Sequence, residues 1–122
     1  MESKFQLIYY QKANGEIPIL EFLKEQPIRD QKKLFGLFQL LESQGNNLRE
    51  PQSKPLKDGI FELRVKGSTG AIRVLYFFFI GQKIVLTNAA IKKSMKLPAS
   101  VFQQARKYRE DFISRIKEID NE

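Results

Sequence analysis

The sequence predicts an α+β fold, in which two N-terminal helices and a C-terminal helix pack on a mainly antiparallel sheet. Three observations predict it. Apolar residues recur at helical spacing near both ends of the chain, alternating or β-branched segments lie between them, and glycine-containing turns join those segments. The expected order is β-α-α-β-β-β-α with the helices on one face of the sheet, and residues 1–122 are expected to form a single domain.

The first half predicts one strand and two helices. Residues 5–11 are apolar and aromatic, which is typical of a strand, and Asn14-Gly15 predicts a turn after it. Pro18 suits the first position of a short helix, because its missing N–H is not needed there. A second helix is expected from about Ile28 to Gln44, where leucine and phenylalanine fall on one face and Gly45 follows as a stop. Residues 46–53 are polar and turn-rich.

Three strands in a row are expected next. Residues 61–66 alternate between apolar and charged side chains, which predicts a strand with one face toward water. Residues 67–70 contain two glycines and predict a hairpin turn. Residues 71–79 are β-branched and aromatic and predict a central strand buried on most of both faces, followed by a further strand over residues 83–89.

The last helix is expected to begin at Pro98. Apolar residues then recur every three or four positions and form a continuous stripe that can face the sheet. The members of the stripe are Val101, Ala105, Tyr108, Phe112, Ile116 and Ile119.

The positive charge is concentrated in the middle of the chain. The net charge is +7; residues 51–109 hold twelve basic and two acidic side chains, a surplus of +10, whereas residues 1–50 sum to zero and residues 110–122 to −3. A surplus confined to one stretch produces a directed field that attracts a polyanion such as nucleic acid. The alternative is that these lysines only keep the surface soluble.

Composition excludes several classes of site. The chain has no histidine and no cysteine, so histidine-based triads, cysteine nucleophiles and the usual zinc sites are excluded. Glycine-rich phosphate loops are absent, and Asp58 and Glu62 alone could hardly hold metal ions, so no cofactor is expected. The longest apolar run, residues 74–80, is too short to span a bilayer, and no signal peptide is visible. A cytoplasmic protein without membrane contact is expected.

The remaining residue types suit metal-free RNA cleavage, in which the 2′-hydroxyl attacks the adjacent phosphate. Arginines such as Arg64 and Arg73 can stabilise the charge that develops on phosphorus, and a lysine crowded by cations can exchange a proton. Tyr76 is a further candidate, although three residues beyond Arg73 it should point to the opposite face. Either arginine could instead pair structurally with Glu62, and the loop lysines Lys54 and Lys57 could simply be solvated.

Several segments together resemble the RelE/ParE toxin superfamily, and specifically its HigB-like branch, which includes phage-derived proteins. The resemblance lies in residues 54–64 (KPLKDGIFELR), 70–76 (GAIRVLY), 91–93 (IKK) and 97–98 (LP), with Ala105 in the closing helix. It implies a compact sheet with two N-terminal helices, a neutralising antitoxin, and cleavage of mRNA in the ribosomal A site.

By position, the resemblance implies a set of site residues. The expected catalytic residues are Lys57, Arg64, Arg73, Lys92 and Lys93, and the expected RNA- or phosphate-binding residues are Lys54, Lys66, Tyr76 and Lys96. One departure concerns Asn88, which stands where many relatives have a histidine and which cannot transfer protons. Either lysines carry the acid–base chemistry, or catalysis is weak, or the activity has changed.

Two other functions remain open at the level of sequence. A ParE-like toxin would poison DNA gyrase instead of cutting RNA, and a non-enzymatic basic module would only bind nucleic acid or an acidic protein. The basic strand face and the paired lysines favour RNA. The expected partners are therefore mRNA, the ribosome and a cognate antitoxin, of a helix-turn-helix DNA-binding type, that forms a hetero-oligomer with the toxin and covers its basic face.

Overall fold

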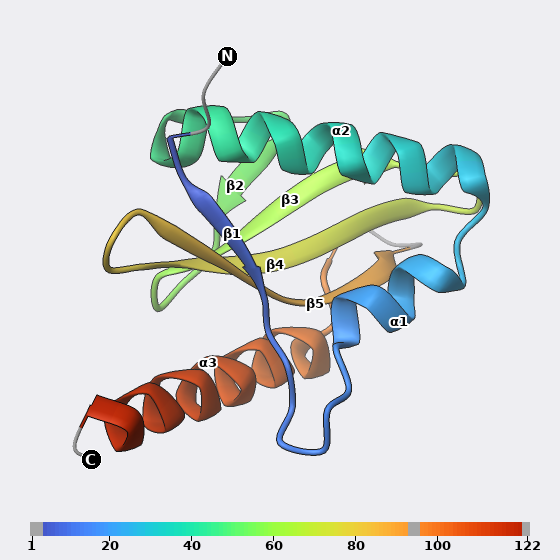
Figure 1. Ribbon diagram of the computed structural model, residues 1–122. Coiled ribbons are helices and arrows are strands. Elements are labelled where there is room, and N and C mark those ends of the chain that lie inside the picture. The colour runs from blue at the N-terminus through green and yellow to red at the C-terminus, as the bar shows by residue number, and fades with distance from the viewer. Residues whose placement is uncertain (1–3, 93–95, 121–122) are drawn as a thin grey trace.

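A five-stranded sheet lies at the centre of the computed structural model, which describes residues 4–92 and 96–120 (Figure 1). Strand β1 (Gln6–Tyr9) is followed by helices α1 (Pro18–Lys24) and α2 (Ile28–Gln44) and a short 3-10 turn (Gly45–Asn47). Strands β2 (Ser53–Pro55), β3 (Ile60–Lys66), β4 (Ala71–Phe79) and β5 (Lys83–Lys92) then lead to helix α3 (Ala99–Asp120). The strand order is β1-β5-β4-β3-β2, with β1 parallel to β5 and the other pairs antiparallel. The predicted α+β class is confirmed.

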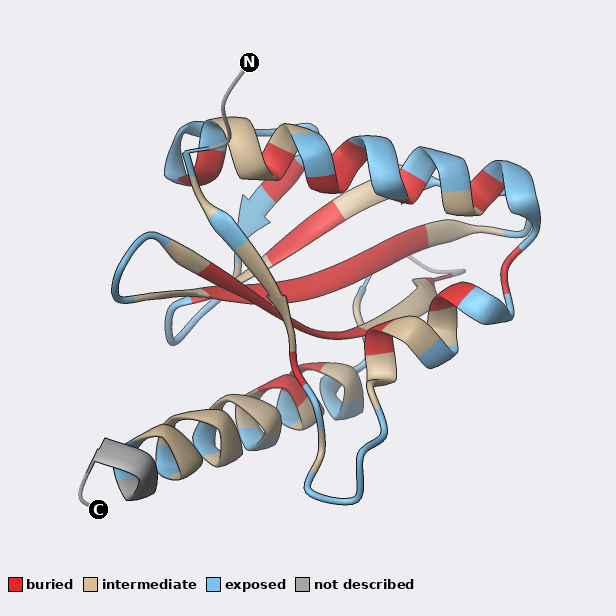
Figure 2. Ribbon diagram, in the orientation of Figure 1, coloured by how far each residue is buried: buried red, intermediate tan, exposed pale blue. Residues whose placement is uncertain are grey.

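The helices cover both faces of the sheet, which corrects the expectation that they lie on one face. Side chains alternate along β4, so Ile72, Val74 and Tyr76 pack in the cluster formed with α1 and α2, whereas Leu75 packs against α3. Because β4 carries apolar side chains on both faces, a helix must pack on each face to remove these side chains from water. Figure 1 shows α2 on one side of the sheet and α3 on the other, and Figure 2 shows β4 buried along most of its length.

Each layer has an apolar core of its own. Leu34, Leu37 and Leu41 of α2 are buried with Leu63 and Ile84 of the sheet. Burying each such leucine stabilises the fold by roughly 1.5–3 kcal/mol relative to leaving it exposed. On the opposite face, α3 is held by Phe102 and Ala105 near its start and by Tyr108 and Phe112 further along. Within the described ranges, no helix combines the length and the apolar character that crossing a membrane requires.

Strand β2 was not expected in the polar segment after α2. It contains only three residues, and Pro55 restricts it to the edge of a sheet because proline cannot donate to the ladder. Its pairing with β3 places Lys54 opposite Glu62. Strand β5 also runs past its predicted end at Ala89 and continues to Lys92. As a result, Lys54 lies on β2 and Lys92 lies on β5, so both lysines are part of the sheet.

The β3–β4 turn is tied to the first turn of α2. Gly67 N–H donates to Gly70 O at 2.9 Å, which confirms the predicted hairpin turn. The buried carboxylate of Asp30 accepts hydrogen bonds from the Ser68 N–H and from the Ser68 hydroxyl, each at 3.0 Å. The hydrogen bond from the Ser68 backbone is the main cause that lowers the pKa of Asp30 below its usual value, and the nearby Lys33 and Arg29 lower it further. The turn that joins the two central strands is thus fixed by one carboxylate.

The lowered pKa makes this tie sensitive to acid. Its contribution is fully present above the unfolded-state pKa of about 3.9 and is lost as the pH falls through the lower folded-state pKa. Asp30→Asn should therefore reduce the free energy of unfolding at pH 7, and the difference from wild type should shrink toward pH 2.5. Urea unfolding at both pH values measures it, with Glu25→Gln, at an exposed position, as the control. An equal loss at both pH values for Asp30→Asn would contradict the prediction.

Candidate nucleic-acid interface

Four cations from four adjacent strands meet on the α3 side of the sheet. Lys54 lies on β2, Arg64 on β3, Arg73 on β4 and Lys92 on β5; we refer to these four residues as the cationic cluster. Arg64 pairs directly with Arg73 across the β3–β4 ladder, and Lys92 pairs with Ala71, which shares the face of Arg73. The other three members of the cluster all influence the charge state of Lys92. The sheet therefore gathers residues that are far apart in sequence.

A buried carboxylate lies within the cluster. The Arg73 Nη1 group donates to Glu62 Oε1 at 2.7 Å, and Arg64 Nε lies 3.7 Å from the same oxygen. Glu62 is 2% exposed and Arg73 is 7% exposed, so the ion pair is shielded from water. The expectation that this face of β3 is open to water is therefore wrong at Glu62, because the two arginines take the place of solvent. The two ion pairs that the sequence suggested, Arg64–Glu62 and Arg73–Glu62, are both present.

The surroundings of Lys92 lower the pKa of its ammonium group. Its side chain is buried, and burial is the main cause that lowers the pKa of its ammonium group. The positive charges of Arg73, Arg64 and Lys54 lower that pKa further, whereas the negative charge of Glu62 partly offsets them. A lysine with a lowered pKa has a larger neutral fraction near physiological pH, so it can accept a proton.

Beside the cluster is a hollow of about 290 Å³ with a cationic rim. Arg64, Lys66 and Arg73 line it together with Pro51, Val65 and Ala71. This places the predicted phosphate ligand Lys66 next to both arginines of the cluster. The donors suit the oxygens of a phosphate group, which a guanidinium can bind two at a time.

Two predicted residues are not members of the cationic cluster. Lys57 is exposed in the loop after β2, and its ammonium group lies 5.3 Å from the ring centre of Phe102 in α3. Tyr76 is 1% exposed and faces α2, as its spacing from Arg73 predicted. Its hydroxyl shares a 2.5 Å hydrogen bond with the Ser53 hydroxyl. Tyr76 therefore has a structural contact in the core, on the opposite face from the cluster.

The remaining predicted residues are in the segment before α3. Lys96 is exposed two residues before Pro98. Lys93 lies outside the described residues. Asn88 is 8% exposed and donates through Nδ2 to the carbonyl of Val101 at 3.1 Å. It therefore joins β5 to the start of α3. Nothing in the sequence pattern indicated this contact between Asn88 and Val101.

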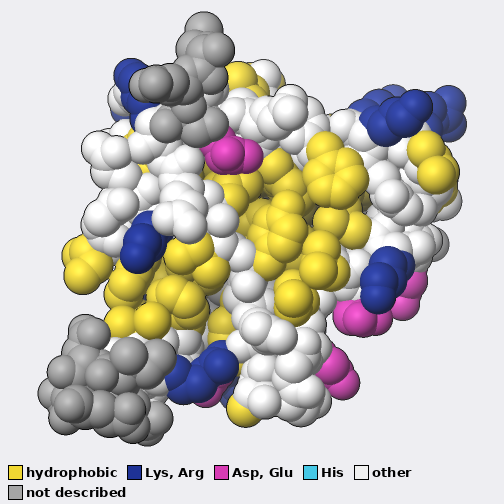
Figure 3. Space-filling view, in the orientation of Figure 1, with side chains coloured by type: hydrophobic (Ala, Val, Ile, Leu, Met, Phe, Trp, Pro, Cys, Tyr) yellow, Lys and Arg dark blue, Asp and Glu magenta, His cyan; other side chains and the backbone are white. Residues whose placement is uncertain are grey.

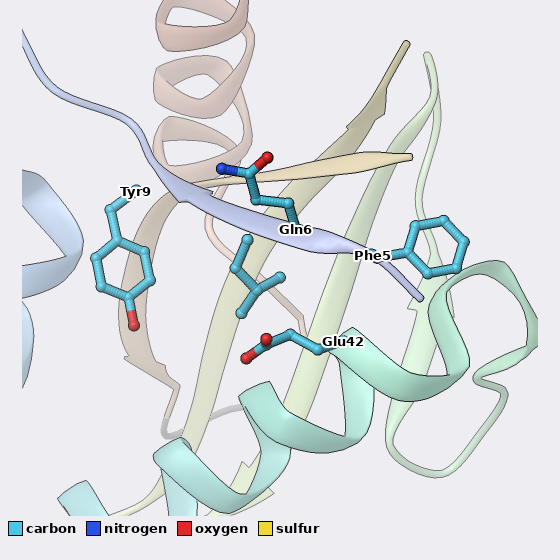
Figure 4. Close-up of a pocket in the computed structure, with 5 residues that line it drawn as sticks. Phe5, Gln6, Tyr9 and Glu42 are labelled. Atoms are coloured by element: carbon cyan, nitrogen blue, oxygen red, sulfur yellow. The ribbon is translucent and has the colours of Figure 1, made fainter. Parts of the chain in front are cut away.

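A second hollow, of about 460 Å³, lies between β1 and α2. Its lining residues are Phe5, Gln6, Leu7, Tyr9 and Glu42, and Figure 4 shows the Glu42 carboxylate rising from α2 toward β1. Figure 3 shows hydrophobic side chains gathered on this face, with lysine and arginine mostly near its margin. Among the described residues its lining holds a carboxylate and no cation, which does not suit a nucleic acid.

One family model matches the chain. It is described as "Phage derived protein Gp49-like (DUF891)", and the match covers residues 21–110, which is more than half of the chain. A comparison with curated proteins found no match. The matched range contains all four residues of the cationic cluster and Glu62.

Proposed function

The chain belongs to the Gp49-like family of phage-derived proteins, which are RelE-like and toxin-like, and we propose that it is a toxin that cleaves mRNA on the ribosome without a metal ion. The observation that carries the proposal is the cationic cluster, in which a buried arginine and a buried lysine stand on adjacent strands of one sheet face. Surface lysines that only keep a protein soluble are not buried together in this way.

The proposed reaction uses the RNA's own 2′-hydroxyl as nucleophile. Neutral Lys92 accepts the 2′-hydroxyl proton, and the oxygen attacks the adjacent phosphorus. Arg64 and Arg73 stabilise the negative charge that develops on the phosphoryl oxygens. A protonated lysine, Lys57 or Lys93, donates a proton to the departing 5′-oxygen. The products are a 2′,3′-cyclic phosphate and a 5′-hydroxyl end, and Lys54, Lys66 and Lys96 bind the flanking phosphates.

The partners follow from the same charge distribution. We propose a cognate antitoxin of the helix-turn-helix type that forms a hetero-oligomer with this chain and presents acidic side chains to the cationic cluster. Opposite charges would speed the association of the two proteins and exclude RNA. A toxin that acts on translated messages would work in the cytoplasm.

The test is controlled expression in growing bacteria, followed by mapping of mRNA 5′ ends. The expected result is growth arrest with new 5′-hydroxyl ends inside translated messages and in register with codons. Arrest with a DNA-damage response and intact messages would indicate a gyrase poison instead. If growth continues and the purified protein binds RNA with a strong salt dependence, a non-enzymatic binding module is the better description.

The lowered pKa of Lys92 predicts a pH dependence of cleavage. Below its pKa the lysine is protonated and cannot accept a proton, so the single-turnover rate should rise with pH, and the rise should level off below the usual lysine value of 10.5. Lys92→Met should lower the rate by roughly 10²–10⁴-fold and flatten the profile. Lys83→Met, at the other end of β5, is the control that should keep both rate and profile. A profile unchanged in Lys92→Met would exclude Lys92 as the base.

A further inference from the structure

Glu62 holds the guanidinium of Arg73 through one of its two amino groups. Nη1 donates to Glu62, whereas the buried Nε has no hydrogen-bond partner among the described residues. In a guanidinium, Nε–H and one N–H of Nη2 point in the same direction and together match two oxygens of a phosphate. The contact with Glu62 uses Nη1. The edge formed by Nε and Nη2, which suits a phosphate group best, therefore has no acceptor at Nε among the described residues.

We propose that Glu62 is a positioning residue, which fixes Arg73 so that its Nε edge is presented to a backbone phosphate of the substrate in the hollow between Arg64, Lys66 and Arg73. The inference rests on the proposed function for the identity of that substrate as RNA. Glu62 does not touch the phosphate itself. It acts through Arg73, and to a lesser degree through Arg64, whose Nε lies 3.7 Å from the same carboxylate oxygen.

The charges of the site are consistent with this role. Lys54, Arg64 and Arg73 carry three positive charges against the one negative charge of Glu62, so a net positive charge remains to attract an anion even when Lys92 is neutral. If Glu62 served only to neutralise positive charge, it would weaken the attraction of the site for an anion. A role in holding Arg73 in place explains why a carboxylate is present there. A buried N–H without a partner is also costly, and a phosphate oxygen at Arg73 Nε would supply the missing acceptor.

The experiment follows the arginine Nε–H resonances by NMR during titration with a 2′-O-methyl RNA trinucleotide, which cannot be cleaved. Arg73→Lys assigns the Arg73 signal, and the exposed Arg49 serves as the internal comparison. The expected result is a shift of the Arg73 signal that saturates, with little change for Arg49. In Glu62→Gln, which keeps the side-chain shape but loses the charge, the Arg73 shift should be reduced severalfold. An Arg73 signal that does not move in the wild type overturns the proposal.

Kinetics on programmed ribosomes separate positioning from binding. Glu62→Gln should lower kcat on the order of 10²-fold through misplacement of Arg73, with a much smaller change in KM. If Glu62→Gln does not fold, as judged by circular dichroism, Glu62→Asp replaces it; that variant retains the charge on a shorter side chain and should also lose kcat. Normal kcat in a folded Glu62 variant overturns the proposal.

The two proposals fail in different ways. A wild-type protein that cleaves no RNA, but whose Arg73 Nε–H signal moves with the trinucleotide and moves severalfold less in Glu62→Gln, refutes the nuclease and supports the positioning role of Glu62. A wild-type protein that cleaves RNA, but whose Arg73 signal does not move, supports the nuclease and refutes the positioning role.

Discussion

Arg73→Lys is expected to lower the rate of RNA cleavage by roughly 10²–10³-fold while the protein stays folded. Lysine keeps a positive charge beside the buried Glu62, so the carboxylate is still paired. It cannot, however, offer two parallel N–H groups to a phosphate, which is the property that makes arginine irreplaceable at such sites. Single-turnover cleavage of ribosome-bound mRNA measures the loss, and growth of cells that express the variant reports it in vivo.

The control for Arg73→Lys is Arg49→Lys, at an exposed position outside the cluster, which should cleave at the wild-type rate. Arg73→Ala is less informative, because it leaves Glu62 buried without its closest partner and should cost about 3–5 kcal/mol of stability. A comparison of the two variants separates loss of chemistry from loss of fold. A wild-type rate in folded Arg73→Lys would remove Arg73 from the site.

Leu75→Ala is expected to produce a large loss of stability on the α3 side of the sheet. Leu75 is 0% exposed and packs with Ile60, Phe102 and Ala105, so its removal leaves a cavity between β4 and α3. The free energy of unfolding should fall by about 2–5 kcal/mol. Urea unfolding followed by circular dichroism measures this change.

Ile80→Ala provides the matched control for that truncation. Ile80 lies just after β4 and is 79% exposed, so shortening it should change the free energy of unfolding by no more than about 0.5 kcal/mol. A loss below about 1 kcal/mol in Leu75→Ala would mean that α3 does not pack on this face. The cationic cluster, on the same face, would then lie on an open sheet.

Much of the fold is encoded in local patterns and was therefore predictable. The bounds of α2, from Ile28 to Gln44, and of β4, from Ala71 to Phe79, agree with the sequence prediction because each is set by periodic apolar residues between turn signals. The three-residue β2 could not be predicted, since it exists only through its pairing with β3. The helices lie on two faces because β4 is apolar on both of them. The sequence predicts this burial of both faces, so the expectation that all helices lie on one face did not follow from it.

The site was predictable where it depends on one hairpin. Arg64 and Arg73 were expected on paired strands and are found directly opposite each other. Lys54 and Lys92 join them because β2 pairs with β3 and because β5 continues past its predicted end at Ala89 to Lys92, neither of which local patterns indicated. The burial of Glu62 likewise depends on the tertiary arrangement, since an acidic residue in an alternating strand looks solvent-exposed in sequence.

The strand order has a consequence for the synthesis of this protein. During translation the residues of the cationic cluster are made in chain order, from Lys54 to Lys92. Strand β1 is one of the first segments made, but it can join the sheet only after residues 83–86 of β5 have been made. Because a chain emerges from its N-terminus, a nascent copy holds an incomplete set of cations until most of its length has been translated. Under the proposed function, a ribosome that makes this protein would not meet a complete cationic cluster during elongation, and an antitoxin would need to capture only finished chains.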